Sequence, residues 1–222
     1  VLAPLTGADL AGLPHFSTID TVAAGIRARL MRVSFTGETG FEVNVPAGQA
    51  AHLWDALLPR VQETGGCAYG TEAMHVLRAE KGYIIVGQET DGTVTPADLG
   101  LGWMTPRSKG DFVGRRSLSR PDMLLPNRRQ LVGLLTDNTA TVLEEGAQIT
   151  AEARPPTGTR ALGHVTSAYH SPALGRSVAL ALVEGGRGRM GERLFVPTPR
   201  GAVAVTVAAP CFLDPEGSRL DG

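Results

Sequence analysis

The chain has 222 residues, of which 42% are hydrophobic and 19% are charged. This is the composition of a globular protein that is long enough to bury a core, and it argues against disorder. The net charge of −1 offers no basic surface to nucleic acid or to anionic lipid, so we expect neither a nucleic acid nor a membrane as a partner.

Targeting signals and metal sites are also not expected. No apolar stretch is long enough to span a bilayer, and the N-terminal VLAPLTGADLAG lacks the basic and apolar regions of a signal peptide. Cys67 and Cys211 lie far apart and outside any CxxC pair, which argues against a disulfide framework or a structural zinc site. The five histidines show no HxxxH or HExxH spacing. These features favour a protein of the reducing cytoplasm that holds no metal.

The first half of the chain predicts a hairpin and two helices. Residues 28–45 carry apolar positions on both sides of TGETG, a run of turn formers, and predict a β-hairpin. The next stretch, AGQAAHLWDALLPRVQETG, has apolar residues at helical spacing and predicts a helix that ends at Gly65–Gly66. A second helix is predicted from Thr71 to Lys81, and YIIV after it is predicted to be a short buried strand.

The second half of the chain predicts strands. Residues 90–129 are rich in Gly and Pro, predict loops, and lead to a domain boundary. Five short strands follow between Gly and Pro turns: QLVGLLT, ALGHVTSAY, SVALALV, ERLFVPT and AVAVTVAA. Such a pattern is typical of a small β-barrel or sandwich. The fold class is therefore α+β, with an αβ domain over residues 1–125 and an all-β domain over residues 126–222.

The segment Gly186–Gly191 reads GRGRMG and matches the GxGxxG of dinucleotide-binding sites by its letters. That fingerprint needs a helix directly after the glycines, because the pyrophosphate rests on the helix N-terminus. The stretch that follows, ERLFVPTP, is strand-like and contains two prolines. We therefore interpret GRGRMG as a turn between strands.

A second cluster of chemically active residues lies in GHVTSAYHSP, which holds His164, Ser167, His170 and Ser171. Serine and histidine side chains this close in the sequence could form a Ser–His nucleophile. However, the chain has no G-x-S-x-G elbow at these serines, and no particular acidic residue can be assigned as a third member of a triad. We favour a strand that runs into a Ser-Pro loop and keep a hydrolase as a remote alternative.

Glu80 is the most informative residue, because it lies near the end of the second predicted helix. At 100° per residue it falls in the same arc as the apolar Val76 and Leu77. A carboxylate in the last turn also interacts poorly with the negative end of the helix dipole. Some other group must compensate it, either a cation such as Arg78 or Lys81, or a ligand that presents paired N–H donors.

Several segments together resemble a known family. RVSFTGETGFEVNVP, GTEAMHVLRAEKG, GQETDGTVTPADLGLGW, DFVGRRSL and GHVTSAYHSP resemble, in this order and spacing, the aminomethyltransferase (glycine-cleavage T-protein) family. TVTPADLGLGW, LVGLLTDN, GRSVALALVEGG and DPEGSRLDG are similar in particular to the C-terminal folate-binding part of the alpha subunits of heterotetrameric sarcosine oxidases. The resemblance implies a T-protein-like fold, in which ferredoxin-like αβ elements precede a C-terminal β-barrel around a tetrahydrofolate pocket.

The resemblance also implies site residues and chemistry. The glutamate of the LRxE segment binds the folate pteridine in that family, which implies this role for Glu80. The basic position before DF(V/I)G faces the folate glutamate tail and corresponds to Lys109, while Tyr69 and Tyr83 could contact the pterin or its aryl ring. The implied function is capture, by tetrahydrofolate, of the one-carbon unit from oxidative demethylation of sarcosine as 5,10-methylenetetrahydrofolate. Reduced folate and other sarcosine oxidase subunits are the implied partners.

Two departures from the family pattern qualify this expectation. The family's catalytic aspartate lies upstream of anything that matches this chain, so no catalytic residue is assigned and we expect an N-terminally truncated fragment that is inactive alone. Flavin and NAD are expected only on other segments or partner subunits. KGYIIVGQE, residues 81–89, faintly resembles the KGCYxGQE signature of folate-binding proteins in iron–sulfur assembly but lacks its cysteine. A non-catalytic folate-binding module and a plain glycine-cleavage aminomethyltransferase remain alternatives.

Overall fold

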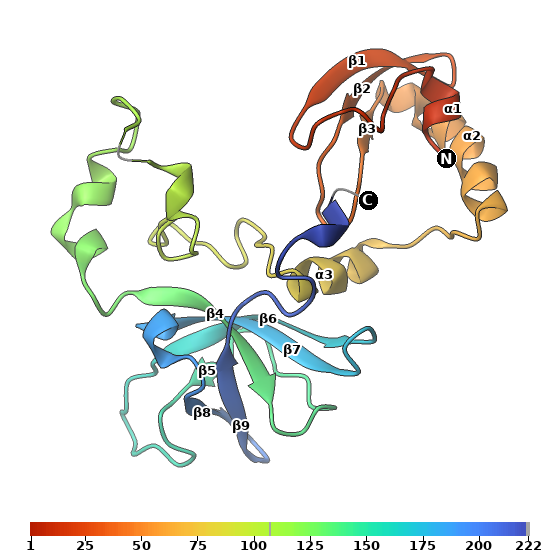
Figure 1. Cartoon of the computed structure of the whole chain (residues 1–222). Helices are drawn as coiled ribbons and strands as arrows, with labels where there is room; N and C mark the ends of the chain where they lie inside the picture. The colour runs from red at the N-terminus through yellow and green to blue at the C-terminus, as the bar shows by residue number, and fades with distance from the viewer. Residues whose placement is uncertain (107, 221–222) are drawn as a thin grey trace. The chain divides into compact units, whose positions relative to one another are not determined.

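The computed structural model describes residues 1–106 and 108–220, which form two compact units. The first comprises Val1–Leu77 with the C-terminal stretch from Glu216, and the second comprises Arg78–Pro215. Each unit contains its own antiparallel sheet (Figure 1). No helix in the described ranges combines the length and the apolar character that a membrane span requires.

The sheet of the first unit has three strands in the order β1-β2-β3. They are β1 (Thr18–Ala23), β2 (Ile26–Met31) and β3 (Glu42–Asn44). The antiparallel pairing of β2 with β3 confirms the predicted hairpin, although residues 32–41 connect the two strands in place of a tight turn. Strand β1 was not predicted, because the two-residue turn at Ala24 and Gly25 that joins it to β2 is a weaker signal than TGETG.

The α-helices among the described residues are α1 (Ala3–Thr6), α2 (Ala50–Glu63) and α3 (Thr71–Glu80), and short 3-10 turns occur at η1 (Ala47–Gln49) and η6 (Ser218–Leu220). The bounds of α2 and α3 confirm both predicted helices. Leu53 is the one residue of α2 that is fully buried, and it packs with Ala23, Ile26 and Ala28 of the sheet. The boundary between the two units falls inside α3, between Leu77 and Arg78.

The sheet of the second unit has six strands in the order β5-β6-β7-β4-β9-β8. The strands are β4 (Arg129–Thr136), β5 (Gln148–Ile149), β6 (Gly163–Ser171), β7 (Arg176–Glu184), β8 (Arg193–Thr198) and β9 (Gly201–Ala208). All neighbours are antiparallel. The five predicted strands are all present, and only the two-residue β5 was missed.

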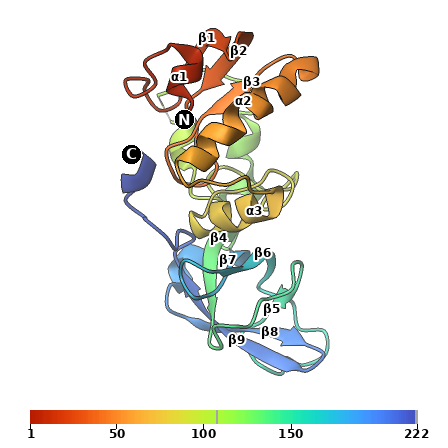
Figure 2. The same ribbon diagram turned by 90° about the vertical axis from the view of Figure 1, so that its right-hand side faces the viewer.

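The two edges of this six-stranded sheet approach each other without forming a continuous ladder. Thr150, just after β5, makes an isolated bridge to Phe195 of β8, with N···O distances of 2.8 and 2.9 Å. Figure 2 shows β5, β8 and β9 gathered at one end of the unit. The sheet is therefore of the barrel type, enclosing a core of aliphatic side chains that includes Val132, Leu134 and Val165, but it is not a closed barrel.

Turns connect the remaining parts of the second unit. They include the 3-10 turns η2 (Gly102–Met104), η3 (Ser117–Ser119), η4 (Pro121–Leu124) and η5 (Gly186–Arg189). GRGRMG lies on η5 and is followed by strand β8, so the interpretation of that segment as a turn between strands is confirmed.

The predicted strand at YIIV, residues 83–86, is wrong. Tyr83 donates its backbone N–H to the carbonyl of Arg78 at 2.9 Å, and Ile85 donates its own to a carboxylate oxygen of Glu89 at 2.8 Å. Val86 is 84% exposed. A helix end and a buried side chain therefore take the backbone hydrogen bonds that a neighbouring strand would have made.

Candidate functional site

The site is centred on Glu80, the last residue of α3. Its side chain is buried, with 2% exposed, so the helical phasing that placed Glu80 on the inward face is confirmed. Its backbone carbonyl accepts hydrogen bonds from the N–H groups of Phe212 (2.8 Å) and Leu213 (3.0 Å). The segment after the last strand therefore supplies two of the donors that satisfy the C-terminal carbonyls of this helix.

The two carboxylate oxygens of Glu80 have different surroundings. Oε1 accepts a hydrogen bond from the Ser171 hydroxyl at 2.5 Å, and that hydroxyl oxygen itself accepts from the N–H of Leu174 at 3.0 Å. Oε2 is equally buried and has no hydrogen-bond partner among the described residues. A buried carboxylate oxygen left without a donor is costly. Glu80 thus presents a buried acceptor whose hydrogen-bonding capacity is unused within the described residues.

Neither of the cations next to Glu80 in the sequence compensates it. Arg78 donates from Nη1 to Glu89 at 2.9 Å, and Lys81 forms an ion pair with Asp214 at 2.9 Å. The neighbouring cations, one of the two kinds of partner that the sequence suggests for Glu80, are therefore engaged elsewhere.

Arg78 and Glu89 form a second buried network whose side chains are both 0% exposed. Arg78 also donates to the hydroxyl of Ser167 at 2.7 Å, and Ser167 donates in turn to Oε1 of Glu89. Glu89 Oε2 accepts from Ile85 as well as from Arg78. Both oxygens of this carboxylate have donors, so the network links the end of α3 to β6 and leaves neither oxygen of Glu89 without a partner.

The two serines that could have acted as nucleophiles are bonded to carboxylates. Ser167 donates to Glu89 and Ser171 donates to Glu80. In the described part of the chain neither hydroxyl donates to a histidine, so the structure gives the hydrolase alternative no support.

The other predicted folate-binding residues are not brought together with Glu80 by any described contact. Tyr83 is half-buried just after α3, where its carbonyl accepts from Arg78 at 3.1 Å. Lys109 is exposed and lies over the ring of Phe112, 4.8 Å from its centroid. Tyr69 belongs to the first unit, where it lines an apolar cavity of about 240 Å³ with side chains of α2 such as Trp54.

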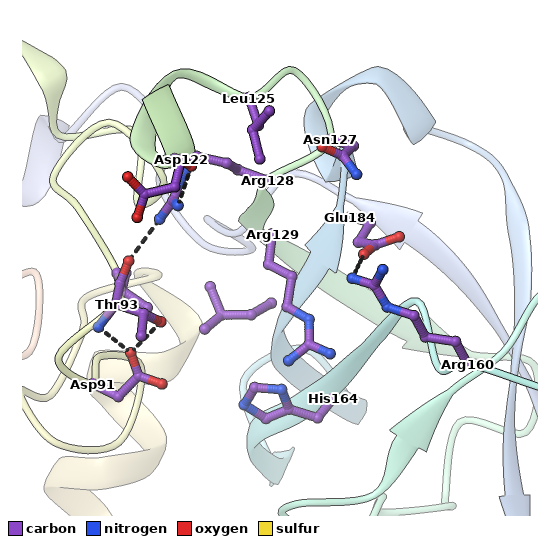
Figure 3. Close-up of a pocket in the computed structure, with 12 residues that line it drawn as sticks. Asp91, Thr93, Asp122, Leu125, Asn127, Arg128, Arg129, Arg160, His164 and Glu184 are labelled. Atoms are coloured by element: carbon purple, nitrogen blue, oxygen red, sulfur yellow. Dashed lines mark hydrogen bonds and ion pairs between the residues drawn. The ribbon is translucent and has the colours of Figure 1, made fainter. Parts of the chain in front are cut away.

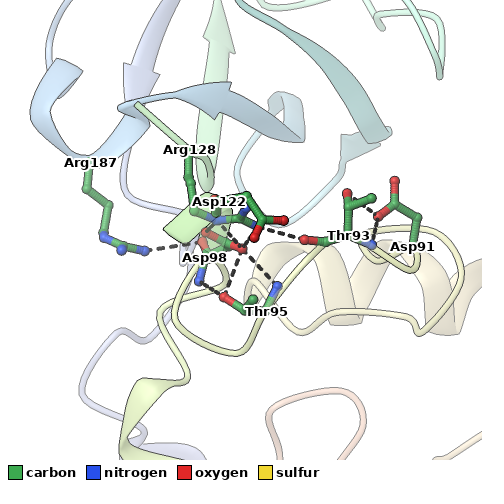
Figure 4. A network of polar contacts seen from close by, with 7 residues as sticks. All are labelled: Asp91, Thr93, Thr95, Asp98, Asp122, Arg128 and Arg187. Atoms are coloured by element: carbon green, nitrogen blue, oxygen red, sulfur yellow. Dashed lines mark hydrogen bonds and ion pairs between the residues drawn. The ribbon is translucent and has the colours of Figure 1, made fainter. Parts of the chain in front are cut away.

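A polar network holds the loop TVTPADLG against the start of β4 (Figure 4). Arg128 donates to both carboxylate oxygens of Asp98 and to the carbonyl of Thr93, and the N–H and hydroxyl of Thr95 also donate to Asp98 at 2.8 Å each. Burial by itself would raise the pKa of Asp98, but these hydrogen bonds outweigh it and hold the pKa below its ordinary value of 3.8. These contacts fix the loop to the residue that precedes β4, so the role of Asp98 here is structural.

The sequence did not reveal the roles of Ser171 and Glu89. The pattern around Ser171 suggests only a nucleophile, and its contact with Glu80 joins positions that are far apart in the chain. Glu89 lies in a Gly-rich loop without periodicity. Only the helical arc that placed Glu80 inside could have prompted a search for a hydroxyl donor on a distant strand.

Comparisons with known proteins agree with the fold. Residues 1–109 match the GCVT N-terminal domain, and residues 129–214 match the glycine cleavage T-protein C-terminal barrel domain. An aminomethyltransferase T of the glycine cleavage system from Bartonella henselae superposes with a TM-score of 0.79 at 24% identity, covering 94% of this chain and 55% of that one. That likeness concerns the fold.

Sequence relatives include two kinds of protein. The sarcosine oxidase subunit alpha of Corynebacterium sp. (strain P-1) is 48% identical over 91% of this chain, and that of Rhizobium meliloti is 39% identical over 86%. The aminomethyltransferase of Streptomyces coelicolor is 37% identical over 83% of this chain and is covered to 48%. This chain spans about a fifth of the alpha subunits, 21% and 20%. The chain belongs to the glycine cleavage T-protein (aminomethyltransferase) family.

Proposed function

We propose that this chain binds tetrahydrofolate through Glu80, as part of a sarcosine oxidase alpha subunit. In that setting folate would take up the one-carbon unit from oxidative demethylation of sarcosine, giving 5,10-methylenetetrahydrofolate. The observation that carries the proposal is the buried Oε2 of Glu80, which has no hydrogen-bond partner among the described residues. The relatives named sarcosine oxidase subunit alpha support the choice of sarcosine.

The chemistry of the carboxylate fits the ligand. The pteridine of a reduced folate presents an amino group and a ring N–H side by side, which is a paired donor that one carboxylate can accept. Oε2 has no donor among the described residues, and Oε1 keeps lone-pair capacity beside its bond from Ser171. Because the site is buried, hydrogen bonds to the Glu80 side chain are stronger there than in water.

The roles of the chain's own residues are binding and orientation. Ser171 holds the Glu80 carboxylate in one rotation, since its hydroxyl oxygen accepts from Leu174 and its proton is directed to Oε1. Tyr83 and Tyr69 are proposed to contact the pterin or aryl ring, and Lys109 the glutamate tail. When bound, tetrahydrofolate supplies the nitrogen nucleophiles that take up the one-carbon unit.

The wider setting is proposed on the same basis. Residues 1–125 would form the αβ folate-binding domain and residues 126–222 the barrel domain, with other sarcosine oxidase subunits as partners. Cys67 and Cys211 are both free, which fits the reducing cytoplasm.

Calorimetric titration with 5-formyltetrahydrofolate tests the proposal. We expect saturable binding by the wild type and a loss of about 1–3 kcal/mol in Glu80→Gln, the range for removing a charged hydrogen-bond partner. Glu192→Gln is the matched control, because Glu192 pairs with Arg189 at the surface. Unchanged affinity in Glu80→Gln would remove Glu80 from the site, and a wild type that does not bind would refute the proposal for this chain.

One-carbon capture is separated from folate binding alone by a second measurement. In a full-length sarcosine oxidase that contains this sequence, we expect Glu80→Gln to increase the free formaldehyde released per sarcosine oxidised in the presence of tetrahydrofolate. If the release of formaldehyde is unchanged while folate binding is weakened, the chain is a binding module without a part in the transfer.

A further inference from the structure

A cleft of about 290 Å³ lies in the second unit at the start of β4 and β6 and the end of β7. In the sheet register Arg129 pairs with Glu184, and His164 pairs with Leu182. Cross-strand partners, and residues two apart on one strand, point to the same face of a sheet. These four side chains therefore share one face, and all of them line the cleft, which we call the Arg129 cleft.

Most charged groups around the Arg129 cleft have described partners: Asp91 accepts from Thr93, and Asp122 pairs with Arg120. Arg160 pairs with Glu184 although Glu184 is the cross-strand neighbour of Arg129. Arg128 is held by Asp98, as described above. For Arg129, no hydrogen bond or ion pair of the guanidinium occurs within the described residues, and Figure 3 shows it reaching toward His164 while Arg160 turns to Glu184. One cation that is uncompensated within this part of the chain therefore faces the cleft.

His164 adds a second group that can hydrogen-bond to an anion in the Arg129 cleft. Burial first, and the nearby Arg129 second, lower the pKa of His164 below its ordinary value of 6.5, and Asp91 opposes them. The ring is therefore mainly neutral at pH 7, with one nitrogen as an N–H donor. An anion between the two side chains would be favoured by both groups.

The remaining walls restrict the class of anion. Leu182 and Val94 contribute apolar surface, and the carboxylates of Asp91, Asp122 and Glu184 also line the cleft. Those carboxylates repel a dianion more than a monoanion. The fork of an arginine matches the two oxygens of a carboxylate, and the volume suits a small molecule.

We propose that the Arg129 cleft binds a small organic monocarboxylate, with its two oxygens on Arg129 and His164 and its apolar part against Leu182 and Val94. This site is separate from Glu80. His164 lies near one end of β6 and Ser171 at the other, which places them roughly 20 Å apart at about 3.3 Å per residue.

Butyrate is the probe, titrated into the full chain at pH 7 while the ring resonances of His164 are followed by NMR. We expect a saturable shift with a dissociation constant on the order of 1 mM and at least about tenfold weaker binding in Arg129→Gln. Arg129→Lys, which keeps the charge and loses the fork, should be intermediate. The control is Arg193→Gln, an exposed arginine paired with Asp137, which should bind butyrate like the wild type.

Four outcomes would overturn the proposal: no saturable shift in the wild type, equal weakening in Arg193→Gln, unchanged butyrate binding in Arg129→Gln, or inorganic phosphate binding as tightly as butyrate. The butyrate titration needs no folate, so it remains readable even if folate binding fails. If 5-formyltetrahydrofolate does bind, Arg129→Gln should leave its affinity unchanged. A parallel loss would assign the cleft to the folate site and reject an independent site.

Discussion

Glu80 and Glu89 are both fully buried, yet their surroundings differ in kind. Glu89 has partners on both oxygens, from Arg78, Ser167 and the backbone of Ile85. Glu80 has one partner, Ser171, and its second oxygen has none among the described residues. A buried glutamate is rare unless it is paired. The partners around Glu89 are those of a structural carboxylate, whereas Glu80 keeps one unused oxygen, which is the basis of the folate contact that we propose for it.

The largest expected effect tests the structural side of this comparison. Glu89→Ala leaves the guanidinium of Arg78 buried without its counter-ion, so we expect the free energy of unfolding to fall by about 3–5 kcal/mol. Urea unfolding followed by circular dichroism measures it. The surface variant Glu192→Ala should cost less than about 1 kcal/mol. A similarly small loss of unfolding free energy in Glu89→Ala would show that the buried network does not stabilise the fold.

Asp98 extends the comparison to a third buried carboxylate with a complete set of partners. Because its folded pKa lies below 3.8, its stabilisation is full above that value and is lost as the pH falls through the lowered folded pKa. We expect Asp98→Asn to lower the free energy of unfolding by about 1.5–3 kcal/mol at neutral pH. We also expect the free energy of unfolding of this variant to fall less steeply with decreasing pH than that of the wild type.

Urea unfolding over a pH series checks this, with Asp20→Asn as the control. The hydrogen bond from Arg29 lowers the pKa of Asp20 as well, but Asp20 is exposed, so its replacement should change the acid limb little. Equal effects of the two variants would mean that burial makes no difference to such a pair.

Ser171→Ala tests the binding side of the comparison. Without its hydroxyl donor, the Glu80 carboxylate loses its fixed rotation, and we expect reduced folate to bind about 1 kcal/mol more weakly. Ser177→Ala is a close control, since Ser177 is a buried serine whose hydroxyl has no partner among the described residues. Calorimetric titration that finds both variants equal to the wild type would deny Ser171 a positioning role.

The smallest expected effect is the change in stability of Glu80→Gln. The amide keeps the size of the side chain and an oxygen that can accept from Ser171, so the free energy of unfolding should change by less than about 1 kcal/mol. Thermal unfolding of this variant beside Glu89→Ala sharpens the contrast. A loss as large as that of Glu89→Ala would place Glu80 among the structural residues.

Elements with a strong period were predictable from the sequence. The helices α2 and α3 and the strands β4, β6, β7, β8 and β9 all follow hydrophobic patterns bounded by Gly or Pro. The strand predicted at YIIV is wrong because four apolar residues in a row do not distinguish a strand from a turn. In the structure the backbone N–H of Ile85 donates to the carboxylate of Glu89 and not to a neighbouring strand. β5 is too short to leave a pattern.

The burial of Glu80 was predictable for the same reason, since helical phasing is local. Its partner was not, because the contact between Glu80 and Ser171 depends on the register of β6 and β7 and on the fold of the loop at Leu174. The pairing of Arg78 with Glu89 in preference to Glu80 likewise needed three-dimensional information.

The hydrogen bonds from Phe212 and Leu213 to the carbonyl of Glu80 have a consequence for biosynthesis. A ribosome releases these residues long after α3 has left the exit tunnel, because every strand of the six-stranded sheet comes between them. During translation the carbonyl of Glu80 therefore lacks these two hydrogen bonds until Phe212 and Leu213 have been made. The surroundings of Glu80 are completed only when the segment after the last strand has been made, so an unfinished chain cannot hold Glu80 as the finished one does.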